Sequence, residues 1–377
     1  MKRSIYIPVM VSLALGGAAG FFVGLRKRGE AKSFSPPPAA ASVTSEPTPR
    51  SIGVPVSSPA PTTPLATRLR EALTQPDEFS RGAAWQSLLD EMTAEEAREV
   101  RAIFRECDKE GRWFPREFEA FWLKWGEVSG LAAMDELQGD PTLRHTTHLY
   151  ARVAEGWARR DAASVKAWLA ANQETALNPE HIQKGLVLGL ASTTLTAATD
   201  YVTSLGPSAN SDHLASEIAW TAVYQRGLPA AQEWLKNLWA SPQSADLPLQ
   251  RATRALAEAS LRGGPESLDA FVKSIPRAAG LQQMIPEVVE RWAGGNGMSV
   301  LECVDSLPPE YFDEHAVNRL LENWNVKDLD AMGLWLRENR DFRFYNLAAE
   351  RYAQTLDDVD PAAARQWRDS LKENQPR

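Results

Sequence analysis

The feature that most constrains this fold is a pattern that recurs about every 32 or 33 residues between residues 117 and 371. Residues 313–339 show one unit clearly. Three apolar residues spaced four apart form a stripe on its first helix: Ala316, Leu320 and Trp324. Asp328 then offers an N-cap for a second helix that carries Trp335. The unit predicts a helix–turn–helix whose helices are too short to be stable alone.

Eight units share this pattern, with Trp335 as the register mark of its unit. The residues equivalent to it are Glu136, Trp168, Tyr201, Trp234, Phe271, Cys303, Trp335 and Trp367. Seven residues earlier, each unit has a residue type that is favoured at N-caps: Ser129, Asp161, Thr194, Gly227, Gly264, Asn296, Asp328 and Asp360. Fifteen residues before each mark, we expect a core residue: Phe121, Val153, Leu186, Ala219, Leu256, Val288, Leu320 and Tyr352.

A small residue stands four positions before each mark: Ala132, Ser164, Ala197, Ala230, Ser267, Ser299, Ala331 and Ala363. We expect this column to let the two helices of a hairpin approach closely, with the following large residue filling the gap. The column also resembles the second helix of tetratricopeptide-type hairpins, which have a similar period. The first helix lacks the Trp-x-x-Leu-Gly-x-x-Tyr pattern of that family. The Trp157–Trp168 segment is also similar to repeats of membrane-anchored bacterial proteins of no known activity.

We therefore expect an all-α fold. The repeats over 117–377 predict a right-handed α-solenoid of about eight helix–turn–helix units of 32–33 residues. A helical N-terminal cap is expected over 67–116, because Thr93 and Glu96 form a capping box there. An aromatic run from Trp113 to Trp125 leads into the first unit. We interpret it as a buried junction, with a ligand platform as the alternative.

Residues 1–29 contain a mostly apolar segment, 4–25, flanked by basic residues, and its length is enough to span a bilayer. It predicts a membrane anchor; a cleaved signal peptide is the alternative. Gly16, Gly20 and Gly24 form a stripe that permits helix packing in the membrane and a homodimer. Residues 30–66 are rich in Pro, Ser and Ala and predict a disordered linker. We expect a single-pass protein of the bacterial inner membrane with a periplasmic body.

The charge balance argues against nucleic acid as a partner. Residues 67–377 carry 34 basic and 47 acidic side chains, whereas phosphate binding requires a basic surface.

The chain shows no convincing catalytic, cofactor or metal motif. His145 and His148 are three residues apart, but no third ligand completes a zinc spacing. Cys107 and Cys303 lie too far apart in the repeat order for an expected disulfide, and Cys303 is expected to be buried. We therefore expect no enzymatic activity and no cofactor.

Anchor, linker and solenoid together predict a membrane-tethered scaffold whose groove holds a protein or peptide. Two alternatives stay open: a structural homo-oligomer formed through the glycine stripe, or an accessory module for cell-wall enzymes.

Overall fold

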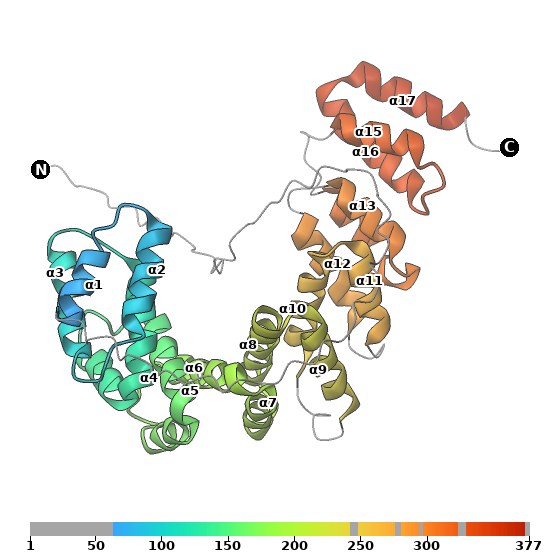
Figure 1. Cartoon of the computed structure of the whole chain (residues 1–377). Helices are drawn as coiled ribbons and strands as arrows, with labels where there is room; N and C mark the ends of the chain where they lie inside the picture. The colour runs from blue at the N-terminus through green and yellow to red at the C-terminus, as the bar shows by residue number, and fades with distance from the viewer. Residues whose placement is uncertain (1–62, 242–247, 276–279, 294–296, 323–328, 374–377) are drawn as a thin grey trace, which may run out of the picture. The chain divides into compact units, whose positions relative to one another are not determined.

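The computed structural model describes residues 63–241, 248–275, 280–293, 297–322 and 329–373. Within these ranges the chain forms seventeen α-helices and one short 3-10 helix, with no strand. The expected all-α fold is confirmed for this part of the chain (Figure 1). The helices of the N-terminal half are α1 (Leu65–Ala72), α2 (Glu78–Leu89), α3 (Ala97–Lys109), α4 (Pro115–Gly139), α5 (Thr147–Ala171), α6 (Pro179–Thr193), α7 (Leu195–Ser204), α8 (Ala209–Arg226) and α9 (Leu228–Ala240). Those of the C-terminal half are α10 (Gln250–Leu261), α11 (Pro265–Ser274), α12 (Leu281–Ala293), α13 (Gly297–Ser306), the 3-10 helix Pro309–Tyr311, α14 (Glu314–Glu322), α15 (Leu329–Glu338), α16 (Tyr345–Val359) and α17 (Pro361–Glu373).

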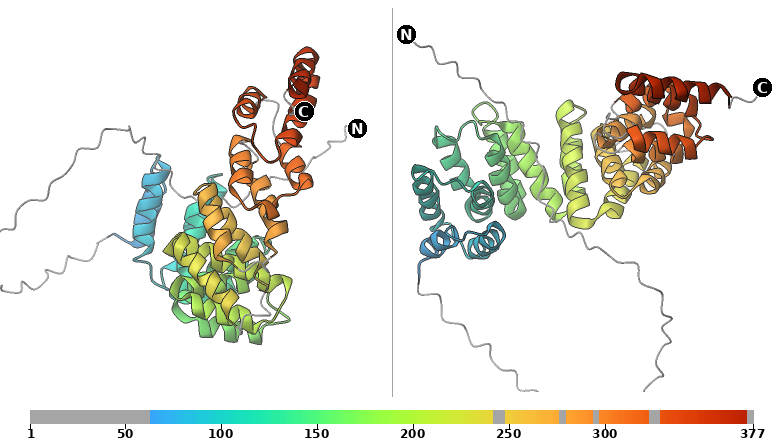
Figure 2. Two further views of the ribbon diagram at one scale, coloured as in Figure 1. Left: turned by 90° about the vertical axis from the view of Figure 1, so that its right-hand side faces the viewer. Right: turned by 90° about the horizontal axis from the view of Figure 1, so that it is seen from above.

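Helices that are consecutive in the repeat order pack against one another (Figures 1 and 2). The first helices of successive units form the contacts α4–α5, α5–α6, α6–α8, α8–α10, α10–α12, α12–α14 and α14–α16. Second helices add the contacts α11–α13 and α13–α15. Each unit therefore buries its apolar face against its neighbours, an arrangement consistent with a helical solenoid.

The predicted N-cap column marks the junction between the two helices in every unit where the structure describes it. Thr194, Gly227 and Gly264 are the N-caps of α7, α9 and α11. The two glycines have φ values of 84° and 103°, a region that residues with a Cβ rarely adopt. Asp360 accepts hydrogen bonds from the backbone N–H groups of Ala362 and Ala363, both at 3.0 Å. Two further column members, Asn296 and Asp328, lie outside the described residues.

In the first two units the turn is reduced to one residue. α4 and α5 continue through the predicted junctions, but Ser129 (φ −157°, ψ 74°) and Asp161 (φ −150°, ψ 80°) leave the helical conformation. Asp161 still caps the second half of α5, because its Oδ1 accepts the N–H of Ser164 at 3.0 Å. The hairpin is therefore kept as a sharp kink in each of these two helices.

The predicted core column is buried in all eight units. Its members are Phe121, Val153, Leu186, Ala219, Leu256, Val288, Leu320 and Tyr352, and the most exposed of them, Tyr352, is only 8% exposed. The column joins one hydrophobic core that runs from α1 to α17. The spacing of the repeat therefore locates the inner face of the first helices correctly.

The prediction for the small-residue column was wrong. Ala230 and Ala331 are exposed, and the other members whose side chains are described are only half-buried. The buried column is the next one along the second helices: Ala133, Val165, Ala198, Ala231, Leu268, Val300, Met332 and Ala364, none more than 3% exposed. One residue corresponds to about 100° of rotation around a helix, so this shift turns the packing face away from the predicted position.

Glycines in the first helices form close helix contacts. A methyl group on Gly126 of α4 would overlap the carbonyl oxygen of Val153 in α5, and one on Gly156 would overlap that of Leu123 in α4. Gly185 of α6 meets the carbonyl oxygen of Ala151 in the same way. The absence of a Cβ at these positions lets α4, α5 and α6 approach backbone to backbone.

Ion pairs also follow the repeat. Side chains 33 residues apart on the first helices of adjacent units pair as Glu119–Arg152 (3.4 Å), Lys184–Glu217 (2.6 Å), Arg254–Glu287 (2.5 Å) and Glu258–Arg291 (2.9 Å). Each pair is partly exposed, so each contributes about 0–1 kcal/mol. All four pairs join neighbouring first helices, which are close to one repeat apart in the sequence.

The segment before the first repeat is helical as expected and forms α1, α2 and α3, and its predicted capping box is confirmed. The backbone N–H of Thr93 donates to Glu96 Oε2 at 2.9 Å, and that of Glu96 donates to Thr93 Oγ1 at 3.4 Å. The cap is fixed to the first repeat by Trp85, whose Nε1–H donates to the carbonyl of Glu117 at 3.0 Å. Arg81 pairs with the buried Glu117 carboxylate at 2.8 Å beside this bond.

Several predictions fall on residues outside the described ranges: the anchor over 1–29 with Gly16, Gly20 and Gly24, and the linker as far as residue 62. In the part of the chain that is described, no helix combines the length and the hydropathy needed to cross a membrane.

Candidate functional site

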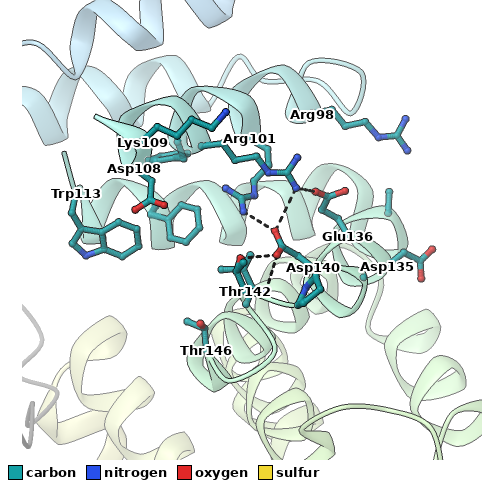
Figure 3. Close-up of a pocket in the computed structure, with 17 residues that line it drawn as sticks. Arg98, Arg101, Asp108, Lys109, Trp113, Asp135, Glu136, Asp140, Thr142 and Thr146 are labelled. Atoms are coloured by element: carbon teal, nitrogen blue, oxygen red, sulfur yellow. Dashed lines mark hydrogen bonds and ion pairs between the residues drawn. The ribbon is translucent and has the colours of Figure 1, made fainter. Parts of the chain in front are cut away.

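An open cleft of about 960 Å³ lies between α3, the second half of α4 and the segment that leads into α5 (Figure 3). α3 lines it with a row of basic side chains: Arg98, Arg101, Arg105 and Lys109. Their spacing of three or four residues places them on one face of the helix. The second half of α4 and its C-cap contribute the acidic residues Asp135, Glu136 and Asp140.

The wall of the cleft is built around Asp140. Its Oδ2 accepts hydrogen bonds from Arg101 at 3.0 Å and from Arg105 at 3.4 Å, while Arg105 also binds Glu136 at 2.8 Å (Figure 3). Its Oδ1 accepts the backbone N–H of Thr142 at 3.0 Å and the hydroxyl of the same residue at 2.6 Å. Both oxygens are thus occupied, and the bonds tie α3 to the start of the next repeat.

Arg101 is a buried cation in this wall. It is 6% exposed, and its guanidinium lies 5.4 Å from the ring centroid of Phe118 and 5.8 Å from that of Trp122. Such cation–π contacts, together with the carboxylate of Asp140, compensate part of the cost of burying the charge.

Burial determines how these groups titrate. Desolvation lowers the pKa of Arg101, and the nearby Arg105 lowers it further, against the opposing effect of Asp140. Burial would raise the pKa of Asp140, but its hydrogen bonds from Thr142 and Arg101 outweigh this effect and lower it. Asp140 therefore remains ionised, as the counter-charge that the buried guanidinium requires.

An aromatic surface borders the cleft. Trp113 is 61% exposed, and its ring centroid lies 5.3 Å from that of Phe118. Phe118, Phe121, Trp122 and Trp125 are all buried. The interpretation of this run as a buried junction is therefore confirmed for its four inner members, whereas Trp113 offers an apolar face to the cleft.

The charged side chains of the cleft fall into a paired set and an unpaired set. The central charged groups, Arg101, Arg105, Glu136 and Asp140, are bound to one another, so they fix the shape of the wall. Arg98, Lys109 and Asp135 line the same cleft and form no ion pair with any residue that the structure describes. They can bind ligand charges of either sign beside the exposed ring of Trp113.

The residues considered for metal chemistry do not assemble. His145 and His148 are both exposed, and His148 Nε2 lies 3.8 Å from Glu119 Oε1. Among the described residues, no group of three or more His, Cys, Asp or Glu side chains could hold a metal ion. Cys107 and Cys303 are both buried, which confirms the expected burial of Cys303.

Sequence reasoning did not find the cleft. The basic spacing from Arg98 to Lys109 and the turn-forming sequence Asp140-Pro141-Thr142 are visible in the sequence. Their partnership depends on the packing of α3 against α4, which no local pattern specifies. Comparisons of this chain with protein-family models, curated protein sequences and solved structures returned no match.

Proposed function

We propose that this chain is a membrane-tethered protein–protein interaction scaffold of the bacterial cell envelope, with a right-handed α-solenoid as its binding body. In this proposal the body binds a segment of another protein and performs no reaction itself. The cleft between α3 and α4 is the binding site, and the segment 4–25 holds the protein to the membrane.

The observation that carries the proposal is the cleft with the exposed Trp113 at its side. Trp, Tyr and Arg side chains are enriched among the few residues that carry most of the binding energy of protein interfaces. Trp113 is supported from behind by Phe118, and Arg98 projects from α3 along the same cleft (Figure 3). A partner side chain that covers Trp113 would bury apolar surface beside charged groups able to fix its orientation.

The prearranged wall supports the same function. Because Asp140 is bound by Arg101, Arg105 and Thr142, the cleft keeps its shape without a ligand. A preformed site loses less conformational entropy on binding than one that must be ordered. Stacked helical repeats of this kind commonly use such extended surfaces to bind other polypeptides.

The experiment uses full-length protein that carries an affinity tag, recovered after crosslinking in cells. Trp113→Ala and Asp135→Arg change exposed groups in the cleft, so both variants should fold normally. Leu334→Ala is a matched control, since Leu334 is 57% exposed on α15 and lies outside the cleft. We expect one partner protein to be lost with both cleft variants and retained with the control.

If the cleft variants recover as much of the partner as the wild-type protein does, the cleft is not the binding site. Recovery of this protein alone would favour the homo-oligomer formed through Gly16, Gly20 and Gly24.

A further inference from the structure

A second cavity of about 470 Å³ lies between the end of α5, the start of α6 and α7. It is separate from the cleft described above and shares no lining residue with it. Its walls are mostly apolar and include Leu169, Pro179 and Leu205. A cavity of this size falls within the range of small-molecule sites.

The charge that lines this cavity has one sign. Lys166 is the single charged residue in its lining, on a body whose acidic residues outnumber its basic ones. The Lys166 Nζ lies 5.1 Å from the ring centroid of Tyr201, and it makes no ion pair with any described residue. The exposed ammonium thus lies over an aromatic face and is free to pair with the charge of an anionic ligand.

Two hydrogen-bond donors accompany this cation. Gln183 Oε1 accepts a hydrogen bond from Asn210 at 2.7 Å, which leaves the Nε2–H₂ group of Gln183 to donate elsewhere. That group and the hydroxyl of Tyr201 donate to no described residue, and both residues line the cavity. Burial raises the pKa of Tyr201, so its hydroxyl keeps its proton and remains a donor.

We propose that this cavity is a binding site for a monocarboxylate with a short apolar body. An ammonium and two neutral donors match the acceptor oxygens of one carboxylate, and the apolar walls match a hydrocarbon chain. A doubly charged anion would require more cations than the one present here. Two sources share this chemistry: a free short-chain acid, and the C-terminal carboxylate of a polypeptide that ends in an apolar residue.

The test is calorimetric titration of the full-length protein with hexanoate, with hexylamine, and with acetyl-glycyl-leucine as the free acid and as the amide. We expect the two carboxylates to bind and the amine and the amide to bind at least about tenfold more weakly, because only a carboxylate pairs with Lys166. Tighter binding of hexanoate identifies a free short-chain acid as the ligand class, and tighter binding of acetyl-glycyl-leucine identifies a polypeptide C-terminus.

Two variants test the residues. Lys166→Gln removes an exposed charge, and Tyr201→Phe removes one hydroxyl while keeping the ring that packs in the core. We expect Lys166→Gln to weaken carboxylate binding by about tenfold or more, and Tyr201→Phe to weaken it several-fold. Lys236→Gln and Tyr224→Phe are matched controls on exposed residues outside the cavity and should leave binding unchanged.

Three results would overturn the assignment: neither carboxylate binds, hexylamine binds as tightly as hexanoate, or Lys166→Gln retains the original affinity. Cleft variants such as Trp113→Ala should leave carboxylate binding unchanged, so this inference and the proposed scaffold function can fail separately.

Discussion

Gly126 of α4 and Gly156 of α5 lie on opposite sides of one helix contact. At each position a side chain would overlap the backbone of the other helix. A methyl group on Gly126 would overlap the carbonyl of Val153, and one on Gly156 would overlap the carbonyl of Leu123. The two positions are 30 residues apart, close to one repeat. The contact between the first two units therefore depends on residues that have no side chain.

Gly156→Ala should destabilise the protein, although Ala is the better helix former. Helix propensity favours Ala by about 0.5–1 kcal/mol, but the overlap with the Leu123 carbonyl forces α4 and α5 apart and should cost about 1–3 kcal/mol. Urea denaturation measures the balance. Gly82→Ala in α2 is the control, because nothing lies within 4 Å of the added methyl group; it should be neutral or slightly stabilising. A stabilised Gly156→Ala variant would contradict the close contact.

Asp140→Asn should destabilise the protein by about 3 kcal/mol at neutral pH, because it leaves the buried guanidinium of Arg101 without a counter-charge. The pKa of Asp140 is lowered in the folded state, so its contribution to stability is present above the unfolded pKa of about 4 and is lost as the pH falls through the folded value. The difference in unfolding free energy between wild type and variant should shrink below about pH 4. Asp108→Asn, on the same cleft but exposed, should change stability little at any pH.

His181 should make the protein less stable in mild acid. Burial lowers its pKa, and the positive charge of Lys184 lowers it further. Smaller effects come from Glu180, which raises the pKa, and from His213 and His148, which lower it. Below the unfolded pKa of about 6.5 the unfolded chain takes up the proton first, so stability falls as the pH decreases through this region. Urea midpoints at pH 8 and pH 5.5 should therefore differ less for His181→Gln than for wild type. If the pH dependence of His181→Gln equals that of wild type, other groups cause it. His145→Gln, in an exposed loop, is the matched control.

Much of the fold could be predicted because it depends on local pattern. Phe121 and its seven equivalents are buried as predicted, since a four-residue spacing on a short helix determines which face is apolar. Thr194, Gly227 and Gly264 were predicted as N-caps because a cap depends on the residue type beside the helix.

What the sequence did not predict depends on tertiary contacts. Ala331 and Met332 are both acceptable on a packing face, and only the position of the neighbouring helix decides that Met332 is buried and Ala331 exposed. Gly126 and Gly156 gave no signal because glycine inside a helix is usually a cost. The cleft was not predicted because it depends on a tertiary contact and forms only where α3 packs against α4.

The measurement that tests the central claim most directly is site-specific photocrosslinking in cells, with a photoreactive amino acid that keeps a large aromatic ring at position 113 of the full-length protein. We predict a crosslink to one other protein from position 113, where Trp113 is 61% exposed, and none from position 334 on α15, where Leu334 is 57% exposed. The crosslink at 113 should disappear when Asp135→Arg is added beside it in the cleft. Equal crosslinking from both positions, or crosslinks to this chain alone, would contradict a protein-binding cleft between α3 and α4.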